Sequence, residues 1–172
     1  MSELVMQIRE FLIPYLISQI VSLCFLWAAI KNSSIARVGF FLMFLWAAMI
    51  NLYTVLNTPD VYLEYAYFAV APYREFINGW FSRYHTIIVP LIAVGQFVIA
   101  LAMLLRNPWF KFACIGAIVF LISIAPLLVG AAFPFSITVS IAAWLTFRKD
   151  SGDFLWRWNR KKIGHAFDPE NH

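Results

Sequence analysis

The sequence contains little charge. Lys, Arg, Asp and Glu together make up 13% of its 172 residues, whereas 62% are hydrophobic. A soluble domain has about 25% charged residues, because polar side chains must cover its core. The shortage of charge therefore excludes a soluble globular fold, and the 17 Phe, 7 Trp and 7 Tyr exclude a disordered or coiled-coil chain. We expect the chain to lie in a lipid bilayer.

Residues that bind metals and cofactors are also scarce. The two cysteines, Cys24 and Cys114, lie in separate apolar runs, and of the three histidines His85 lies nearest such a run. A haem held by two imidazoles, a di-iron centre and a structural zinc site each need more ligands. We therefore predict no metal and no cofactor, with a bound quinone or lipid left open. Phosphate loops, nucleophile elbows and HExxH pairs are absent, so we expect no enzyme activity from the chain on its own.

Long apolar runs dominate the sequence instead. A bilayer core about 30 Å thick is crossed by roughly 20 residues of helix. Three runs have this length, at residues 11–30, 38–56 and 87–105, and the stretch at 110–147 holds two more helices, at 112–129 and 131–147, with Gly130 and Pro134 at their turn. We predict an all-α membrane helix bundle at residues 1–147, with five transmembrane helices, an interfacial helical loop at 57–86 and a tail at 148–172.

The distribution of basic residues predicts the orientation. Ten of the thirteen Lys and Arg residues lie in the loops after the first and third spans and in the tail. Because basic segments stay in the cytoplasm, the N-terminus is expected outside and the C-terminus in the cytoplasm, as in a bacterial inner (cytoplasmic) membrane. Four spans would place the tail across the membrane from one of the two basic loops.

Uncharged polar residues gather in the outer half of the predicted bundle. Asn51 lies five residues from the outer end of the second span, and Gln96 lies near the middle of the third. At about 1.5 Å per residue the two amides have neighbouring depths. Two interpretations stay open: hydrogen bonds between helices, worth about 0.6 kcal/mol each, or the polar floor of a ligand cavity.

The long outer loop lies above these amides. Pro59 is placed to open a short helix and Pro72 to end it, and a second short helix follows in the sequence. The loop either packs over the bundle as a lid or gates a pocket for a quinone or lipid headgroup. The candidate ligand-binding residues are Asn51, Tyr53, Asn57, Asp60, Tyr65, Arg83, His85 and Gln96.

The tail combines basic and aromatic residues in FRKDSGDFLWRWNRKK. Such a segment next to the last span is typical of a membrane-surface anchor, where each cation contributes about 1 kcal/mol near anionic lipid. Docking to a partner stays open, whereas nucleic acid is not an expected partner. The predicted membrane-surface cations are Arg157, Arg160, Lys161 and Lys162.

The last four spans and the long loop after the first of them resemble the DoxX-like group of small bacterial membrane proteins. Arg37 and Gly39 enter a Phe-rich span, and residues 94–105 read VGQFVIALAMLL. The chain departs from the group at Gln96, where an acidic residue often lies, and in its additional first helix. The resemblance implies a four-helix bundle that associates with quinone or thiol redox systems and often has no activity alone.

Three functions remain open at this point. The first is a non-catalytic subunit or binding protein that holds a hydrophobic ligand, quinone or lipid, in its outer half or docks into a larger membrane complex. The second is a small-solute or lipid transporter gated by the outer loop, and the third is a DoxX-like redox-associated subunit. The expected partners are membrane lipids and either other membrane subunits or further copies of the chain.

Overall fold

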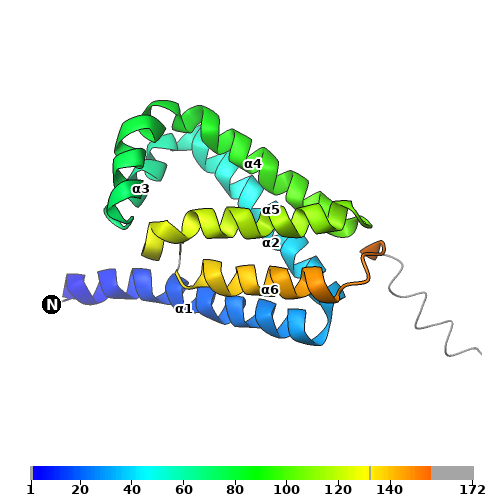
Figure 1. Ribbon diagram of the computed structural model, residues 1–172. Coiled ribbons are helices and arrows are strands. Elements are labelled where there is room, and N and C mark those ends of the chain that lie inside the picture. The colour runs from blue at the N-terminus through cyan, green and yellow to red at the C-terminus, as the bar shows by residue number, and fades with distance from the viewer. Residues whose placement is uncertain (1, 132, 156–172) are drawn as a thin grey trace, which may run out of the picture.

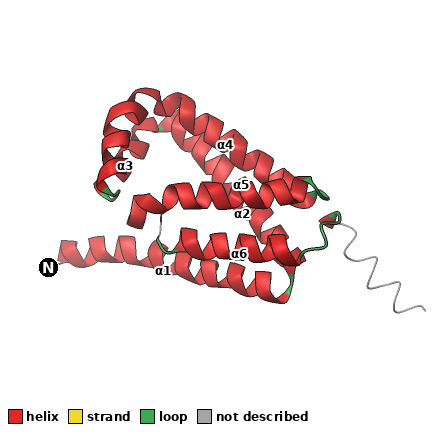
Figure 2. Cartoon of the chain, viewed as in Figure 1, coloured by secondary structure: helices red, strands yellow, loops and turns green. Residues whose placement is uncertain are grey.

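The computed structural model describes residues 2–131 and 133–155, and in these ranges the chain is helical without strands (Figure 2). The all-helical prediction is confirmed. The long helices are α1 (Ser2–Lys31), α2 (Ser33–Asn57), α4 (Ser82–Leu104), α5 (Trp109–Ile124) and α6 (Phe135–Lys149). The short helices are η1 (Pro59–Tyr67), α3 (Ala71–Phe76), η2 (Ile77–Phe81) and η3 (Ala125–Ala131).

Four helical segments in the described ranges are long and apolar enough to cross a membrane: Leu12–Lys31, Ser33–Asn57, Ala71–Leu104 and Trp109–Leu128. Many of their large apolar side chains are exposed, as lipid requires, so the chain is an integral membrane protein. The predicted fifth span corresponds to α6, whose 15 residues extend about 22 Å at about 1.5 Å per residue. This is shorter than the bilayer core, so the structure does not establish five crossings.

Four of the five predicted spans belong to helices that begin before the apolar run, at Ser2, Ser33, Ser82 and Trp109, whereas α6 begins at Phe135, after the predicted start at 131. α2 begins at Ser33 rather than Val38, because Asn32 Oδ1 accepts the backbone N–H groups of Ser34 and Ile35 and caps the helix. α4 begins at Ser82 rather than Ile87 and continues directly from η2. The added turn of α2 brings Arg37 inside the helix.

Contacts between neighbouring long helices run around the bundle in the order α1, α6, α5, α4, α2 and back to α1, and α2 also contacts α6. We call residues 59–81, which form η1, α3 and η2, the lid. The end of the bundle that carries it is the lid end, and the opposite end, where α6 leads into residues 150–155, is the tail end. α1 and α6 lie side by side in Figure 1, and α5 runs antiparallel to α6.

The core is concentrated toward the tail end. Phe25 and Phe40 pack there with ring centroids 4.9 Å apart, surrounded by buried alanines from α1, α2, α4, α5 and α6. Small residues let membrane helices approach closely. The approach of α2 to α1 is close at Gly39, since a Cβ atom there would lie 3.0 Å from the Phe25 ring. A smaller cluster of Ala66, Ala69 and Ile77 lies within the lid.

The lid and α1 complete the turn between α5 and α6. The Val70 N–H donates to Pro126 O at 3.1 Å, and the Tyr73 hydroxyl donates to Ser123 O at 2.7 Å. From the other side, the Tyr15 hydroxyl donates to Phe133 O at 3.0 Å. Irregular backbone is stable at membrane depth where protein groups satisfy it. The lid is therefore fixed to the bundle at this turn as well as at α2 and α4.

The lid itself differs from the predicted loop. η1 ends at Tyr67, and Pro72 lies in the first turn of α3 instead of ending the first loop helix. The first turn suits proline, because the N–H group that it lacks has no partner there in any helix.

Candidate functional site

Three polar side chains connect the lid to α2 and α4. Asn51 Nδ2 donates to Gln96 Oε1 at 2.8 Å, and the Tyr62 hydroxyl donates to Asn51 Oδ1 at 3.0 Å. Gln96 is 2% exposed. Burial raises the pKa of Tyr62 from 10.0, so its hydroxyl keeps the proton that it donates. The chain of bonds from Gln96 to Tyr62 uses neutral groups throughout.

A second polar contact joins the start of α4 to the lid. His85 Nδ1 lies 2.9 Å from Ser82 O, and because a carbonyl can only accept, Nδ1 carries a proton. His85 Nε2 lies 3.5 Å from Asp60 Oδ1 and is buried without a hydrogen-bond partner in the described residues. The Asp60 side chain is 87% exposed. Protonation of Nε2 would turn this contact into an ion pair across the base of the lid.

The other predicted ligand-binding residues lie apart from these two contacts. Tyr53 and Asn57 are exposed on α2, where Asn57 Nδ2 donates to Tyr53 O at 2.7 Å. Tyr65 packs against the small cluster within the lid. Burial raises the pKa of Tyr65, and the neighbouring Glu64 carboxylate raises it further. Arg83 is exposed. The structure thus brings together Asn51 with Gln96 and Asp60 with His85, and ligand binding by these residues stays a prediction.

The lid contains a hollow of about 420 Å³ that the sequence did not indicate. Arg74 is held at its wall by two bonds to the end of η1, from Nε to Ala66 O at 3.1 Å and from Nη2 to Ala69 O at 3.3 Å. The lining residues are Leu63, Glu64, Ala66, Tyr67, Arg74 and Asn78. They come from η1, α3 and η2, so the hollow exists only because the lid folds back on itself.

Exposed aromatic rings follow the lid into α4. Phe76 stacks on Trp80 with ring centroids 5.6 Å apart, and Trp80 packs on Tyr84 at 5.3 Å. All three side chains are exposed and are spaced four residues apart, so they lie on one face. Trp and Tyr gather where a membrane protein crosses the headgroup region. We call these three rings the aromatic ladder.

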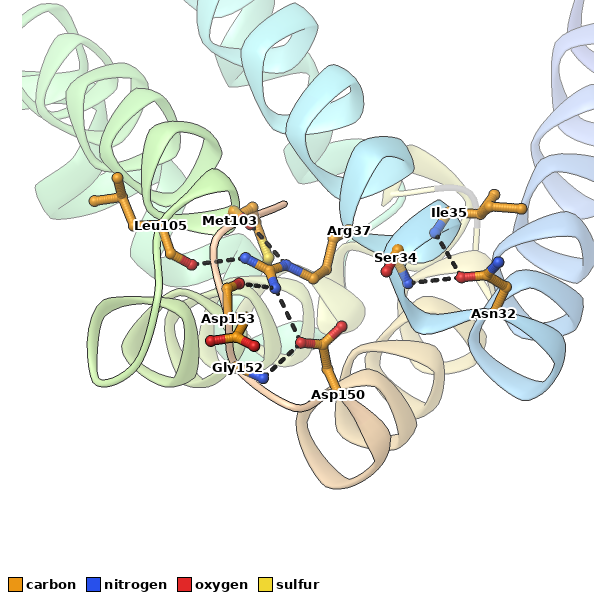
Figure 3. Close-up of polar contacts among 9 residues, drawn as sticks. All are labelled: Asn32, Ser34, Ile35, Arg37, Met103, Leu105, Asp150, Gly152 and Asp153. Atoms are coloured by element: carbon orange, nitrogen blue, oxygen red, sulfur yellow. Dashed lines mark hydrogen bonds and ion pairs between the residues drawn. The ribbon is translucent and has the colours of Figure 1, made fainter. Parts of the chain in front are cut away.

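The most buried charge lies at the opposite end. Arg37 is 2% exposed and donates four hydrogen bonds, from Nε to Met103 O at 2.9 Å, from Nη2 to Leu105 O at 2.6 Å, and from Nη1 to Asp150 Oδ1 at 2.9 Å and Asp153 O at 2.8 Å (Figure 3). The Asp150 side chain is 4% exposed. The Arg37 guanidinium also lies 4.2 Å from the centroid of the Phe110 ring. We call Arg37, Asp150 and the backbone around them the clamp.

Hydrogen bonds of the backbone after α6 hold the Asp150 carboxylate in place. The Gly152 N–H donates to Asp150 Oδ1 at 2.8 Å, and Gly152 O accepts the Asn107 N–H at 2.7 Å. Gly152 has a φ of +72°, which side chains disfavour. The clamp therefore ties α2, the end of α4, the α4–α5 connection and the first residues after α6.

Sequence reasoning missed both the clamp and the hollow. Arg37 precedes the second apolar run, where Lys and Arg normally lie at the membrane surface, so the sequence gives no signal of its buried partners. The predicted membrane-surface cations at 157, 160, 161 and 162 lie outside the described residues. In the described ranges no three His, Cys, Asp or Glu side chains are placed to hold a metal ion.

Comparison of the chain with family models, with curated proteins and with solved structures finds no match. The DoxX-like resemblance therefore stays a prediction, and the functional argument depends on the geometry.

Proposed function

We propose that this integral membrane protein is a non-catalytic phospholipid-binding protein whose lid takes up a lipid headgroup on the outer side of a bacterial inner membrane. The observation that carries this proposal is the hollow at the level of the exposed aromatic ladder, which combines Glu64, Arg74 and Asn78 with apolar lining. Ligand sites combine apolar walls with a few convergent polar groups in this way.

The proposal includes a fifth crossing by α6. The α5–α6 turn lies against the lid: Pro126 O and Phe133 O of the turn accept from the Val70 N–H and the Tyr15 hydroxyl, and Ser123 O at the end of α5 accepts from the Tyr73 hydroxyl. Although α6 is shorter than the bilayer core, it can then complete a crossing, because the irregular turn before it is covered by protein instead of lipid. Arg37, Arg106, Lys111 and Arg148 all lie toward the tail end, so the positive-inside rule favours the lid end outside and the tail in the cytoplasm. Reporters attached to the two termini test this topology, and finding both on one side contradicts it.

The contacts of the lid favour a binding protein over a transporter. A transport gate would need to break the bonds of Tyr62 to Asn51, of Tyr73 to Ser123 and of Val70 to Pro126 in each cycle. A phospholipid headgroup reaches the hollow from the membrane surface without such a movement. A quinone ring carries no charge and would leave Glu64 and Arg74 unused.

Filling the hollow tests the proposal. In Asn78→Phe the new ring occupies the hollow, and we expect the purified protein to retain several-fold less phospholipid after detergent washing. Gly79→Phe is the matched control, because it adds the same ring one residue away, where a Cβ atom meets nothing within 4 Å. Equal phospholipid content in the wild type and both variants would contradict headgroup binding in the lid, and a retained quinone in place of phospholipid would favour the redox alternative.

A further inference from the structure

We propose that the hollow selects a zwitterionic aminophospholipid, in which Arg74 binds the phosphate and Glu64 binds the ammonium group. This inference deepens the proposed function and rests on it. The chemistry that is recognised is a phosphate and a primary ammonium joined by a short linker, as in phosphatidylethanolamine.

The first argument is that the two opposite charges are separate. Glu64 and Arg74 line the same hollow, yet no ion pair joins them in the described part of the chain. Oppositely charged side chains that line a hollow of about 420 Å³ and form no ion pair with each other leave room for a ligand between them. A ligand that carries both charges can satisfy both side chains at once.

The second argument is that Arg74 is already oriented. Its Nε and Nη2 atoms are fixed by the carbonyls of Ala66 and Ala69. A guanidinium has five N–H donors, so those on Nη1 remain for a ligand. Arginine is suited to phosphate because its donors form a rigid planar fork. Asn78 and Tyr67 add neutral donors to the same hollow.

The third argument is the charge of the lid. Residues 59–81 contain Asp60, Glu64 and Glu75 but a single basic residue, Arg74, so their net charge is −2. A headgroup that carries only negative charge is repelled by this surface, whereas an ammonium group is attracted to it. The lid is therefore matched to a zwitterion rather than to an anionic lipid.

The volume of the hollow and its position next to the aromatic ladder fit a lipid headgroup. A volume of about 420 Å³ lies near the lower end of the range of roughly 300–1,000 Å³ for small-molecule sites, which suits a headgroup rather than an entire lipid. The neighbouring ladder of Phe76, Trp80 and Tyr84 lies at headgroup level, so the acyl chains remain in the bilayer.

The experiment uses the full chain purified from bilayers that contain equal amounts of phosphatidylethanolamine and phosphatidylglycerol, with the retained lipids quantified by mass spectrometry. We expect the wild type to be enriched in phosphatidylethanolamine by about three- to tenfold. Glu64→Gln should abolish this preference. Glu75→Gln is the matched control, since it removes the same charge from the lid at a position that does not line the hollow. Arg74→Gln should lower the retention of both lipids, and Arg74→Lys should restore it only in part.

The outcomes separate the two proposals. If Glu64→Gln and Glu75→Gln reduce the preference equally, net charge alone explains it and the inference is wrong. If the wild type retains phospholipid without headgroup preference, the inference fails while the proposed function stands. If no phospholipid is retained, the proposed function fails. Competition with soluble phosphoethanolamine distinguishes the source: displacement of lipid by it would show that the hollow recognises the free zwitterion too, and absence of displacement, together with enrichment, supports recognition of the membrane lipid.

Discussion

At the tail end, one buried cation is surrounded by three backbone carbonyls and a buried carboxylate, so the clamp leaves Arg37 no contact with water. At the lid end, neutral amides and hydroxyls form single hydrogen bonds between segments, and the charged side chains Asp60, Glu64 and Arg74 remain open to the surface. A buried charge tolerates no loss of a partner, whereas a neutral bond in a membrane can be replaced at low cost. The tail end is therefore the part of the bundle that tolerates the loss of a partner least, and the proposed binding site lies at the end whose bonds can be replaced.

Arg37→Met is expected to have the largest effect on stability. It leaves the buried Asp150 carboxylate without its cation and takes the Arg37 donor from the carbonyls of Met103, Leu105 and Asp153, and breaking a buried ion pair costs about 3–5 kcal/mol. Denaturant unfolding in detergent, followed by Trp fluorescence, measures the change. Arg106→Met, which removes an exposed cation at the same end, should cost less than about 1 kcal/mol. Equal losses in the two variants would show that the clamp contributes only surface charge.

Gly152→Ala should have the next largest effect. A Cβ atom at φ +72° is strained by about 1–2 kcal/mol, and it would also overlap the Asn107 side chain. We expect faster amide hydrogen exchange around residue 107 and a lower unfolding midpoint, with the lid unaffected. Accelerated exchange in the lid as well would mean that the two ends of the bundle are coupled.

The amide pair at the lid end should contribute less. Asn51→Leu and Gln96→Leu each remove the bond between α2 and α4, and a double-mutant cycle should give a coupling of about 0.6 kcal/mol, with about 1.7 kcal/mol as an upper bound. If the pair is only a helix contact, both single variants retain phospholipid like the wild type. Loss of lipid from a folded Asn51→Leu protein would place the pair in the binding site.

Alkaline pH should affect the lid end selectively. Because burial raises the folded-state pKa of Tyr62 above the unfolded value of 10.0, the neutral phenol favours the fold below pH 10, and this contribution is lost as the pH rises through the folded-state pKa. Tyr62→Phe should therefore reduce the loss of stability above pH 10, and Tyr67→Phe, which changes an exposed ring, should not. The same alkaline loss in all three proteins would exclude Tyr62 as its source.

The apolar runs predicted the helical fold because the length of a span is set by the bilayer, a constraint that acts locally on the sequence. The neighbouring depths of Asn51 and Gln96 followed from helix rise alone, and the structure brings the two amides within 2.8 Å. The length of α6 was not predictable in this way. Its first residue follows Pro134, and the turn before it depends on bonds from Val70, Tyr73 and Tyr15, which are distant in the sequence.

The candidate site shows the same limit. Arg37 has the sequence context of a loop cation, and its burial follows from acceptors at Met103, Leu105 and Asp150 that no local pattern connects to it. The hollow needs Glu64 and Arg74 to line the same space across a fold of the lid, whereas helical spacing relates residues three or four positions apart. The depth of a side chain in the membrane follows from its position along one helix, but its partners on other segments do not.

The separation of 113 residues between Arg37 and Asp150 also orders the biosynthesis of the protein. A ribosome that adds about 5–20 residues per second completes Asp150 several seconds after Arg37. During that interval the guanidinium has no carboxylate partner and must stay hydrated at the membrane surface, which holds the start of α2 there while α4 and α5 insert. α6 then brings the carboxylate that allows Arg37 to leave water, so the clamp forms only after α4, α5 and α6 have been made.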